Sequence, residues 1–293
     1  MKAPAGLRVG VCTHTGLIRG ANEDDYLLAT PTQVAGSAFL AAVADGMGGA
    51  AGGAEASRTA LRALGSVLLD GDPAVAMRAG FERAAQRVAE AAEAVPALRD
   101  MGTTMTALYL GDGAGCVGHI GDTRLYRLRG DALEVLTDDH SLKQGGSLLT
   151  RCIGAGQRDS EPDCEAVEVE AGDRFLLCTD GVWNVVHEQV LAQGAAARDP
   201  QRAAEELVRA ALNAGAPDNA TAVVVDVVDP RLSEEREVDL PRHERPDARS
   251  LWPAAGSLRA PAWPWLLLLP AVGLLVWAAL RLAGVDVGAS FGR

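Results

Sequence analysis

The stretch Val43-Ala44-Asp45-Gly46-Met47-Gly48-Gly49 lies at the centre of the fold that the sequence predicts. An apolar run, residues 39–44, ends on a single aspartate that is followed at once by glycines. This order predicts a buried strand with a carboxylate at its tip, and then a backbone bend that glycine permits. Residues 54–69 carry apolar side chains at helical spacing, so a helix is expected next. A carboxylate beside a glycine carbonyl suits a hard metal ion; the alternative is that Asp45 only caps the helix.

Aspartates stand at two further ends of apolar runs and in one turn. Asp180 follows the run 174–178, and Asp218 precedes the run 220–228. Asp122 follows a glycine between two apolar runs, where a tight turn between strands is expected. Each aspartate alone is an ordinary turn former. Carboxylates gathered at converging strand ends would repel one another unless cations bind there, so together they predict a metal site.

A polar turn near the start of the chain carries Arg19 and the run Asn22-Glu23-Asp24. A site rich in carboxylates, without thiols or several histidines, favours Mg²⁺ or Mn²⁺ over Zn²⁺. Two such ions about 4 Å apart are a standard arrangement for hydrolysing phosphoryl groups. Arginine grips phosphate oxygens with two parallel hydrogen bonds. The residues therefore predict phosphoryl chemistry, with Arg19 as the phosphate ligand.

The composition excludes several classes of protein. The formal net charge of the 293 residues is -12, and the acidic excess lies before residue 231, which argues against nucleic acid as the main partner. The five cysteines form no Cys-x-x-Cys pair, so neither a zinc site nor a disulfide framework is expected and a reducing compartment fits. No apolar segment of a signal peptide follows Met1, so the front part of the chain is expected in the cytoplasm.

Predicted strands outnumber predicted helices and come in blocks, which indicates an α+β fold with antiparallel sheets covered by helix pairs. Helices are expected over residues 54–69, 73–94, 190–197 and 201–213. Residues 1–230 are expected to form this domain, and residues 231–262, rich in proline and charge, a disordered linker. The apolar residues 263–283, with tryptophans near both ends, predict one transmembrane helix before a short tail, 284–293.

Eight motifs carry a family resemblance, and they stand in a fixed order. Over residues 7–228 the sequence resembles the bacterial branch of the metal-dependent serine/threonine protein phosphatases of type 2C (PPM). The motifs are Arg19-x-x-Asn22-Glu23-Asp24, Val43-Ala44-Asp45-Gly46-Met47-Gly48-Gly49, Met101-Gly102-Thr103-Thr104, Gly118-x-x-Gly121-Asp122-Thr123-Arg124-x-Tyr126, Thr137-x-Asp139-His140-Ser141, Leu149-Thr150-Arg151-x-x-Gly154, Thr179-Asp180-Gly181-Val182-Trp183 and Asp218-Asn219-Ala220-Thr221.

The resemblance implies a four-layer α-β-β-α sandwich with two antiparallel sheets and a binuclear Mn²⁺ or Mg²⁺ centre at one end. By this resemblance, Arg19 and Asp45 act in catalysis, and Arg19 binds the substrate phosphate. The implied metal ligands are Asp45, bridging both ions, the carbonyl of Gly46, Asp180 and Asp218, with Glu23 close by and Asp122 at a third, weaker ion. The implied supporting residues are Asn22, Asp24 and Asn219.

The resemblance further implies hydrolysis of phosphoserine and phosphothreonine in proteins by a metal-activated water, opposing a bacterial serine/threonine kinase and acting on its substrates. With the predicted C-terminal helix, this places a single-pass protein in the inner membrane with its catalytic domain in the cytoplasm. Two alternatives stay open. One is a membrane-anchored pseudophosphatase that binds phosphoproteins, and the other is a phosphatase of small phosphoesters or of an anti-sigma-type regulator, the last disfavoured by Arg19.

Two departures from the family pattern stand out. Met47 occupies the place where some eukaryotic members have a histidine proposed as general acid, and methionine cannot donate a proton. His14 and His140 are possible donors, but both are more simply explained as structural or loop residues. Only residues 142–148 separate two motifs that a helical flap separates in bacterial relatives. A flap this short predicts an open site and loose peptide selectivity.

Overall fold

Two five-stranded antiparallel sheets form the centre of the fold. The computed structural model describes residues 2–30, 37–49, 52–66, 72–111, 113–142, 148–156 and 161–237. The first sheet has the order β14-β8-β7-β4-β3, with bounds Asp163–Glu168, Ala114–Ile120, Met105–Gly111, Ala38–Ala44 and Asp25–Ala29. The second has the order β10-β9-β15-β16-β2, with bounds Ala132–Val135, Arg124–Arg129, Arg174–Cys178, Ala220–Val227 and Leu7–His14.

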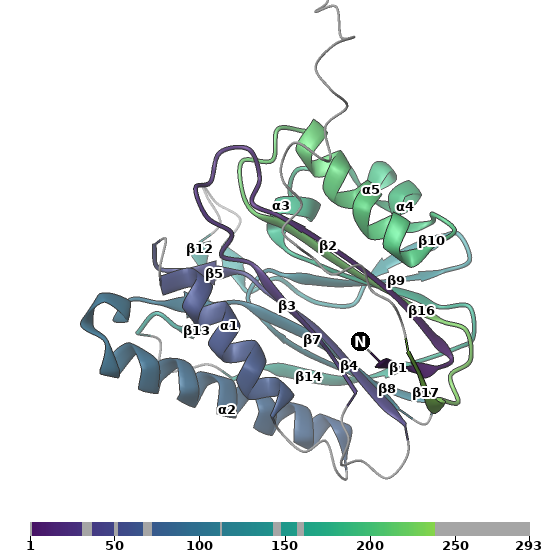
Figure 1. Ribbon diagram of the computed structural model, residues 1–293, viewed down its shortest axis with the longest axis horizontal. Helices are drawn as coiled ribbons and strands as arrows, with labels where there is room; N and C mark the ends of the chain where they lie inside the picture. The colour runs from purple at the N-terminus through teal and green to yellow at the C-terminus, as the bar shows by residue number, and fades with distance from the viewer. Residues whose placement is uncertain are drawn as a thin grey trace, which may run out of the picture. The chain divides into compact units, whose positions relative to one another are not determined.

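A pair of helices covers the outer face of each sheet (Figure 1). Helices α1 (Gly52–Gly65) and α2 (Pro73–Ala94) pack on the first sheet, and α4 (Glu188–Ala195) and α5 (Pro200–Asn213) on the second. Helix α2, the longest of these four, begins at the residue predicted from the sequence. Asp72 accepts hydrogen bonds from the N–H groups of Ala74 and Val75, and Pro73 fits the first helical turn. Shorter elements are α3 (Asp180–Trp183) and the 3₁₀ turn Pro96–Leu98.

Strand β4 shows why the sandwich has four layers. Every residue of this strand is buried, since both faces of its sheet are covered. Leu40 and Ala42 face the core shared with α1 and α2, whereas Phe39 and Val43 face the core between the two sheets. The predicted α+β sandwich with two antiparallel sheets is thus confirmed, and strand β4 leads directly to Asp45.

Small local sheets complete the fold around the end of β4. Strand β5 (Gly46–Met47) pairs with β6 (Gly102–Thr103), which also pairs with β13 (Ile153–Gly154). Strands β11 (Ser141–Leu142) and β12 (Leu148–Leu149) form a short ladder between the two motifs that a helical flap separates in relatives. These two- and three-stranded ladders put several loops beside Asp45.

The structure corrects one local prediction within the domain and confirms another. The helix expected over 54–69 begins two residues earlier and ends at Gly65, because Gly52 and Gly53 already make the first turn against the carbonyl of Gly49. The turn expected between strands at Asp122 is confirmed, and it crosses between the layers because β8 and β9 belong to different sheets. Local apolar spacing cannot reveal which sheet a strand joins.

The structure also differs from the predictions at the end of the domain. Strand β17 (Ser233–Glu237) pairs with β1 (Lys2–Ala5), so the start of the expected linker 231–262 is a strand. Its charged sequence lacks an apolar period, and backbone pairing supplies what the pattern does not show. The rest of the expected linker, the expected transmembrane helix 263–283 and the tail 284–293 lie outside the described residues. Within the described ranges, no helix is long and apolar enough to cross a membrane.

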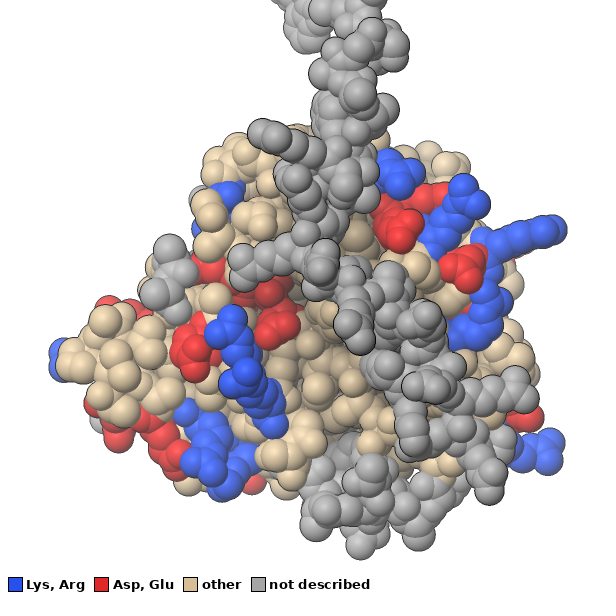
Figure 2. All heavy atoms as spheres, viewed as in Figure 1, with Lys and Arg blue, Asp and Glu red and all other residues tan. Residues whose placement is uncertain are grey.

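Figure 2 shows that acidic and basic side chains adjoin one another on the face it displays. Several of the ion pairs in the described part of the chain link exposed side chains of opposite sign across neighbouring elements, such as Arg8 with Asp199 and Arg78 with Glu161. Exposed pairs of this kind contribute little to stability individually. The surface charge on this face is therefore mixed rather than concentrated in one sign.

Candidate active site

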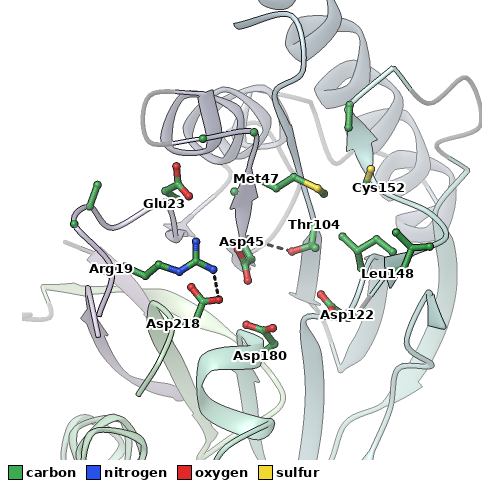
Figure 3. Close-up of a pocket in the computed structure, with 17 residues that line it drawn as sticks. Arg19, Glu23, Asp45, Met47, Thr104, Asp122, Leu148, Cys152, Asp180 and Asp218 are labelled. Atoms are coloured by element: carbon green, nitrogen blue, oxygen red, sulfur yellow. Dashed lines mark hydrogen bonds and ion pairs between the residues drawn. The ribbon is translucent and has the colours of Figure 1, made fainter. Parts of the chain in front are cut away.

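One cavity of about 600 Å³ brings most of the predicted site residues together. Its described lining comprises Arg19, Gly20, Ala21, Glu23, Asp45, Gly46, Met47, Gly48, Gly49, Thr104, Asp122, Leu148, Leu149, Cys152, Ala155, Asp180 and Asp218. Figure 3 shows Asp45, Asp122, Asp180 and Asp218 directed toward a common space, with Arg19 entering from one side. All seven residues predicted to contact metal or phosphate line this cavity, and the three predicted supporting residues lie behind it.

Asp45 is fixed through its backbone. Its N–H donates to Thr104 Oγ1 at 3.0 Å, and its carbonyl accepts from the Thr104 N–H at 2.9 Å and from Thr103 Oγ1 at 2.8 Å. Strand β5 separates Asp45 from α1, so this aspartate does not cap the helix. The alternative of a simple helix cap is therefore wrong, and the side chain of Asp45 is free to face the cavity.

Two glycines allow α1 to approach the site closely. A methyl group added to Gly53 would lie 2.8 Å from the Gly46 carbonyl oxygen and 2.9 Å from Glu23 Cδ. One added to Gly46 would lie 2.1 Å from the Gly53 carbonyl oxygen. Ser57 of α1 donates to the Glu23 carbonyl at 2.7 Å. The start of α1 thus presses Glu23 and the Gly46 backbone into one corner of the cavity.

A network of buried polar side chains holds the loop of residues 15–24 beside the cavity. Asn219 accepts from the Glu23 N–H at 2.8 Å, and its amide nitrogen donates to the carbonyls of Thr15 and Ala21. Asp24 Oδ2 accepts from Thr179 Oγ1 at 2.8 Å and from Thr221 Oγ1 at 2.7 Å, which ties the loop of residues 15–24 to strands β15 and β16. Asn22 donates to Thr13 Oγ1 at 2.8 Å in the same network.

Arg19 lies at the mouth of the cavity and pairs with Asp218. Its Nη2 is 2.6 Å from Asp218 Oδ2, and the two side chains are 50% and 30% exposed. Figure 3 shows this pair on the side of the cavity nearest Glu23. The guanidinium is accessible enough to contact a ligand, and it partly balances the carboxylates around it.

Asp122 is held from the opposite side by an aromatic and an arginine. The Trp183 indole N–H donates to the Asp122 carbonyl at 2.9 Å, and Arg124 Cζ lies 3.5 Å from the centroid of the Trp183 ring. Arg124 itself makes two hydrogen bonds to Asp139, at 2.8 and 2.7 Å. Gly121, with φ of +109°, gives the turn a backbone conformation that residues other than glycine rarely adopt. Asp122 therefore sits on a stiffened crossing between the sheets.

Crowding of the carboxylates raises their pKa values. Burial, followed by repulsion from Asp24, Asp180 and the other aspartates, raises the pKa of Asp45 well above its usual range. Burial and then the charge of Asp180 raise the pKa of Asp122 to about 7. Burial and then the charge of Asp218 raise the pKa of Asp180. Negative charge is thus costly at this place unless cations are present.

The donor set fits divalent metal ions. Buried side-chain oxygens without a hydrogen-bond partner among the described residues are Glu23 Oε1, Asp24 Oδ1 and Asp180 Oδ1. In the same part of the chain, no three His, Cys, Asp or Glu side chains already form a tight cluster around one point. The repelling carboxylates spread over the cavity wall instead, with Arg19 drawing Asp218 aside. Oxygen-only donors of this kind suit Mg²⁺ or Mn²⁺.

Comparison with known proteins identifies the family. The family model described as Protein phosphatase 2C matches residues 15–219. The chain belongs to the protein phosphatase 2C family. It is 35% identical over 244 residues to the serine/threonine protein phosphatase PstP of Mycobacterium tuberculosis, an alignment that covers 76% of this chain and 45% of PstP. It is 31% identical over 246 residues to the protein phosphatase PhpP of Streptococcus pneumoniae, covering 75% of this chain and 98% of PhpP.

Solved structures of the family share the fold. The catalytic domain of PstP in complex with two manganese ions matches with a TM-score of 0.68 and 33% identity, over 76% of this chain and 99% of that structure. PppA of Pseudomonas aeruginosa matches with a TM-score of 0.66 and 31% identity, over 77% and 99%. The chain spans less than half the length of full-length PstP, and it spans nearly all of PhpP.

Several residues of this phosphatase-family site escaped the sequence reasoning. Thr104 and Trp183 lie within recognised motifs, but nothing in their spacing shows that they hold Asp45 and Asp122. The apolar lining by Leu148, Leu149 and Cys152 was also missed, because these residues come from short ladders without a periodic signal.

The two histidines considered as proton donors do not line the described cavity. His14 Nδ1 accepts from the Gly16 N–H at 2.9 Å, and burial lowers the pKa of His14. His140 Nδ1 accepts from the Gly121 N–H at 3.1 Å, and Nε2 lies 2.9 Å from Asp163 Oδ2. Both residues have structural roles in the loops around the site.

Proposed function

We propose that this chain hydrolyses phosphoserine and phosphothreonine esters in proteins, with Mn²⁺ or Mg²⁺ as cofactor. The observation that carries the proposal is the meeting of Arg19 with five carboxylates in one cavity of a protein phosphatase 2C chain. The printed names of PstP and PhpP, both protein phosphatases, support the same activity. A structure of the PstP catalytic domain contains two manganese ions, which supports two ions as the complement here as well.

We assign the metal-holding residues from the family resemblance, and their places on the cavity wall support the assignment. Asp45 would contact both ions, the Gly46 carbonyl would bind one of them, Asp180 and Asp218 would hold the other, and Glu23 would lie beside them. Asp122 would hold a third ion on the opposite side. When bound, the two ions supply a nucleophilic water at neutral pH and neutralise the charge of the phosphoryl group.

The chain's own residues bind and orient the substrate. Arg19 is half exposed beside the carboxylates, so it exchanges its pairing with Asp218 for two hydrogen bonds to phosphoryl oxygens when substrate enters. This fixes the phosphorus above the carboxylates, on the line of attack. Met47 carries no transferable proton, and the described lining includes no histidine, lysine or tyrosine. The leaving oxygen therefore takes its proton from solvent water in the open cavity.

We further propose that residues 231–262, beyond the part that forms β17, link the domain to a transmembrane helix at 263–283. The absence of charge between residues 260 and 280 and the flanking tryptophans support a single crossing of the inner membrane. This arrangement leaves the catalytic domain in the cytoplasm beside a serine/threonine kinase and that kinase's substrates. Fractionation tests it: the full chain should pellet with membranes, and a chain ending at residue 262 should not.

The activity is tested by manganese-dependent release of phosphate from a phosphothreonine peptide by the full chain. The matched variants are Asp180→Asn in the cavity and Asp131→Asn in an exposed turn. We expect the first to lose turnover and the second to keep it. A wild-type chain that binds manganese without releasing phosphate indicates a pseudophosphatase instead, and efficient turnover of small phosphoesters alone indicates the other alternative.

A further inference from the structure

Arg19 and the residues assigned to the two-ion centre lie toward one side of the cavity, while Asp122 lies on the other side, near Leu148 (Figure 3). The apolar part of the lining away from Arg19 consists of Met47, Leu148, Leu149, Cys152 and Ala155, which we call the apolar side. Figure 3 shows Leu148 and Cys152 across the cavity from Arg19 and Asp218. The cavity of about 600 Å³ extends along this apolar side, which is therefore available to another part of the substrate.

The apolar side has the features of a surface that is covered when the site is used. Leu148 is 66% exposed, although a leucine gains free energy when it is removed from water. Met47 is partly buried beside it, and the flexible thioether adapts to side chains of different shape. Gly48 and Gly49 leave the adjoining rim without side chains, and a Cβ on Gly49 would meet no atom within 4 Å. The described lining thus offers apolar groups to an incoming side chain here.

The reach of a peptide selects the occupant. Consecutive Cα atoms lie 3.80 Å apart, so a residue next to a phosphorylated one cannot move far from the cavity that holds the phosphate. The apolar side belongs to that same cavity, so a neighbouring side chain is within reach of it when Arg19 holds the phosphoryl group. An apolar neighbour is stabilised against these side chains, while a polar neighbour loses water there and gains no hydrogen bond from the side chains of Leu148, Leu149 and Met47.

We propose that the apolar side binds a large apolar side chain that flanks the phosphoserine or phosphothreonine of the substrate, with Leu148 as the main specificity-determining residue. This inference rests on the proposed function, because it concerns the same cavity. In this arrangement strand β12, paired with β11, presents Leu148 to the substrate.

The test compares two phosphothreonine peptides that differ only at the residue before and the residue after the phosphothreonine. Both of these residues are leucine in one peptide and serine in the other. The manganese-loaded full chain is expected to turn over the leucine peptide with a kcat/KM about 10-fold higher. Leu148→Ser should reduce this ratio to about 2 or less, and Leu148→Met should keep it. Val75→Ser is the matched control, because Val75 on α2 is 68% exposed and lies outside the cavity lining; it should keep the ratio.

A second measurement does not depend on turnover. Non-hydrolysable phosphonate analogues of both peptides are titrated against the same variants, and the leucine analogue is expected to bind the wild-type chain about 10-fold more tightly. Equal turnover and equal binding of the two peptides by an active chain overturn the apolar side as a subsite and leave the proposed function standing. A preference that survives Leu148→Ser also overturns it. A metal-loaded chain that hydrolyses neither peptide overturns the proposed function, and the inference falls with it.

Discussion

On the carboxylate side of the cavity, Asp45 and Glu23 are held by several backbone hydrogen bonds, whereas the apolar side includes residues of two-residue strands. The Asp45 backbone makes three hydrogen bonds to Thr103 and Thr104, and the Glu23 backbone is bonded by Asn219 and Ser57. Leu148, by contrast, lies on a two-residue strand and is largely exposed. One cavity thus combines a rigid wall and a loosely held one.

The difference follows from what each side has to do. Carboxylates that repel one another stay in place only if the surrounding structure holds them, and their positions must be accurate to bind metal and orient phosphate. An apolar contact is non-directional, so the side that receives variable peptide residues needs surface but little geometric accuracy. We therefore expect changes on the carboxylate side to affect the reaction itself and changes at Leu148 to affect the choice of substrate.

The largest effect is expected for Asp45→Asn. Removing this carboxylate should lower phosphopeptide turnover by at least about 10³-fold, because both metal sites lose a ligand. The same change should raise the Tm of the metal-free chain by about 2–8 °C, since one of the repelling buried carboxylates disappears. Added Mn²⁺ should then stabilise the wild-type chain and leave the variant almost unaffected. Turnover assays and thermal unfolding with and without Mn²⁺ check both parts.

The exposed variant Asp131→Asn serves as control for this prediction and should match the wild type in all three measurements. If Asp45→Asn keeps full activity in a folded protein, Asp45 does not hold the metals. If the variant loses activity but the Tm of its metal-free form falls, repulsion between the carboxylates does not destabilise the metal-free chain. The contrast between the carboxylate side and the apolar side is then wrong.

The second largest effect is expected at Arg19, which we assign to the substrate phosphate. Arg19→Ala should lower kcat/KM for a phosphopeptide by about 10²-fold, because the phosphoryl oxygens lose a charged donor. Arg19→Lys should recover only part of this, since a lysine cannot make the paired hydrogen bonds of a guanidinium. Neither change should abolish Mn²⁺ binding, because Asp218 is freed from its ion pair. Steady-state kinetics and a Mn²⁺ titration of each variant test this, and unchanged kcat/KM in Arg19→Ala would remove the assignment.

Trp183→Phe should give a smaller effect and sharpen the comparison further. Phenylalanine keeps an aromatic ring against Arg124 but loses the N–H that donates to the Asp122 carbonyl. Loss of an outer partner of a metal ligand typically lowers affinity or activity by 10–100-fold, and we expect about 10-fold here, seen as a higher Mn²⁺ concentration needed for half-maximal turnover. The ratio between the leucine and serine peptides should not change. A changed ratio with an unchanged manganese requirement would show that Trp183 serves the apolar side.

Much of the fold was predictable because its strands carry strong local signals. The all-apolar run before Asp45 and the proline-led helix 73–94 could be read directly from the sequence, and the structure has strand Ala38–Ala44 and helix Pro73–Ala94 there. The partners of each strand were not predictable from local pattern. The crossing at Asp122 and the pairing of β1 with β17 depend on which sheet or edge is free, and this is decided by long-range packing.

The candidate site divides in the same way. Charged residues at strand ends, such as Asp45, Asp180 and Asp218, can be recognised as candidates from their position in the sequence. Residues that act through hydrogen bonds or apolar contact, such as Trp183 and Leu148, do not, because tryptophan and leucine are ordinary core residues in most contexts. Their contribution appears only when distant segments meet.

The last prediction concerns stability rather than turnover and tests the outer support of the carboxylate side at His119. This residue is 2% exposed, and its ring centroid lies 4.6 Å from that of His140, which accepts the Gly121 N–H. Burial and then the neighbouring His140 lower the pKa of His119 to about 4. The unfolded chain takes up this proton near pH 6.5, whereas the folded chain does so only near 4. In that window the unfolded state binds more protons, so this group lowers the free energy of unfolding as the pH falls.

The buried aspartates of the metal-free chain act in the opposite direction, because their pKa values are raised and they bind protons more readily when folded. The measurement is therefore a difference between the wild type and His119→Gln, in which the amide can still donate to the Asp138 carbonyl that lies 3.0 Å from His119 Nε2. Urea unfolding at several pH values from 7 to 4.5 should show the wild type losing about 2–3 kcal/mol relative to the variant. A difference that stays constant with pH means that His119 is charged in the folded protein, and the support behind Gly121 and Asp122 then rests on an ionic contact rather than on a neutral, buried pair of rings.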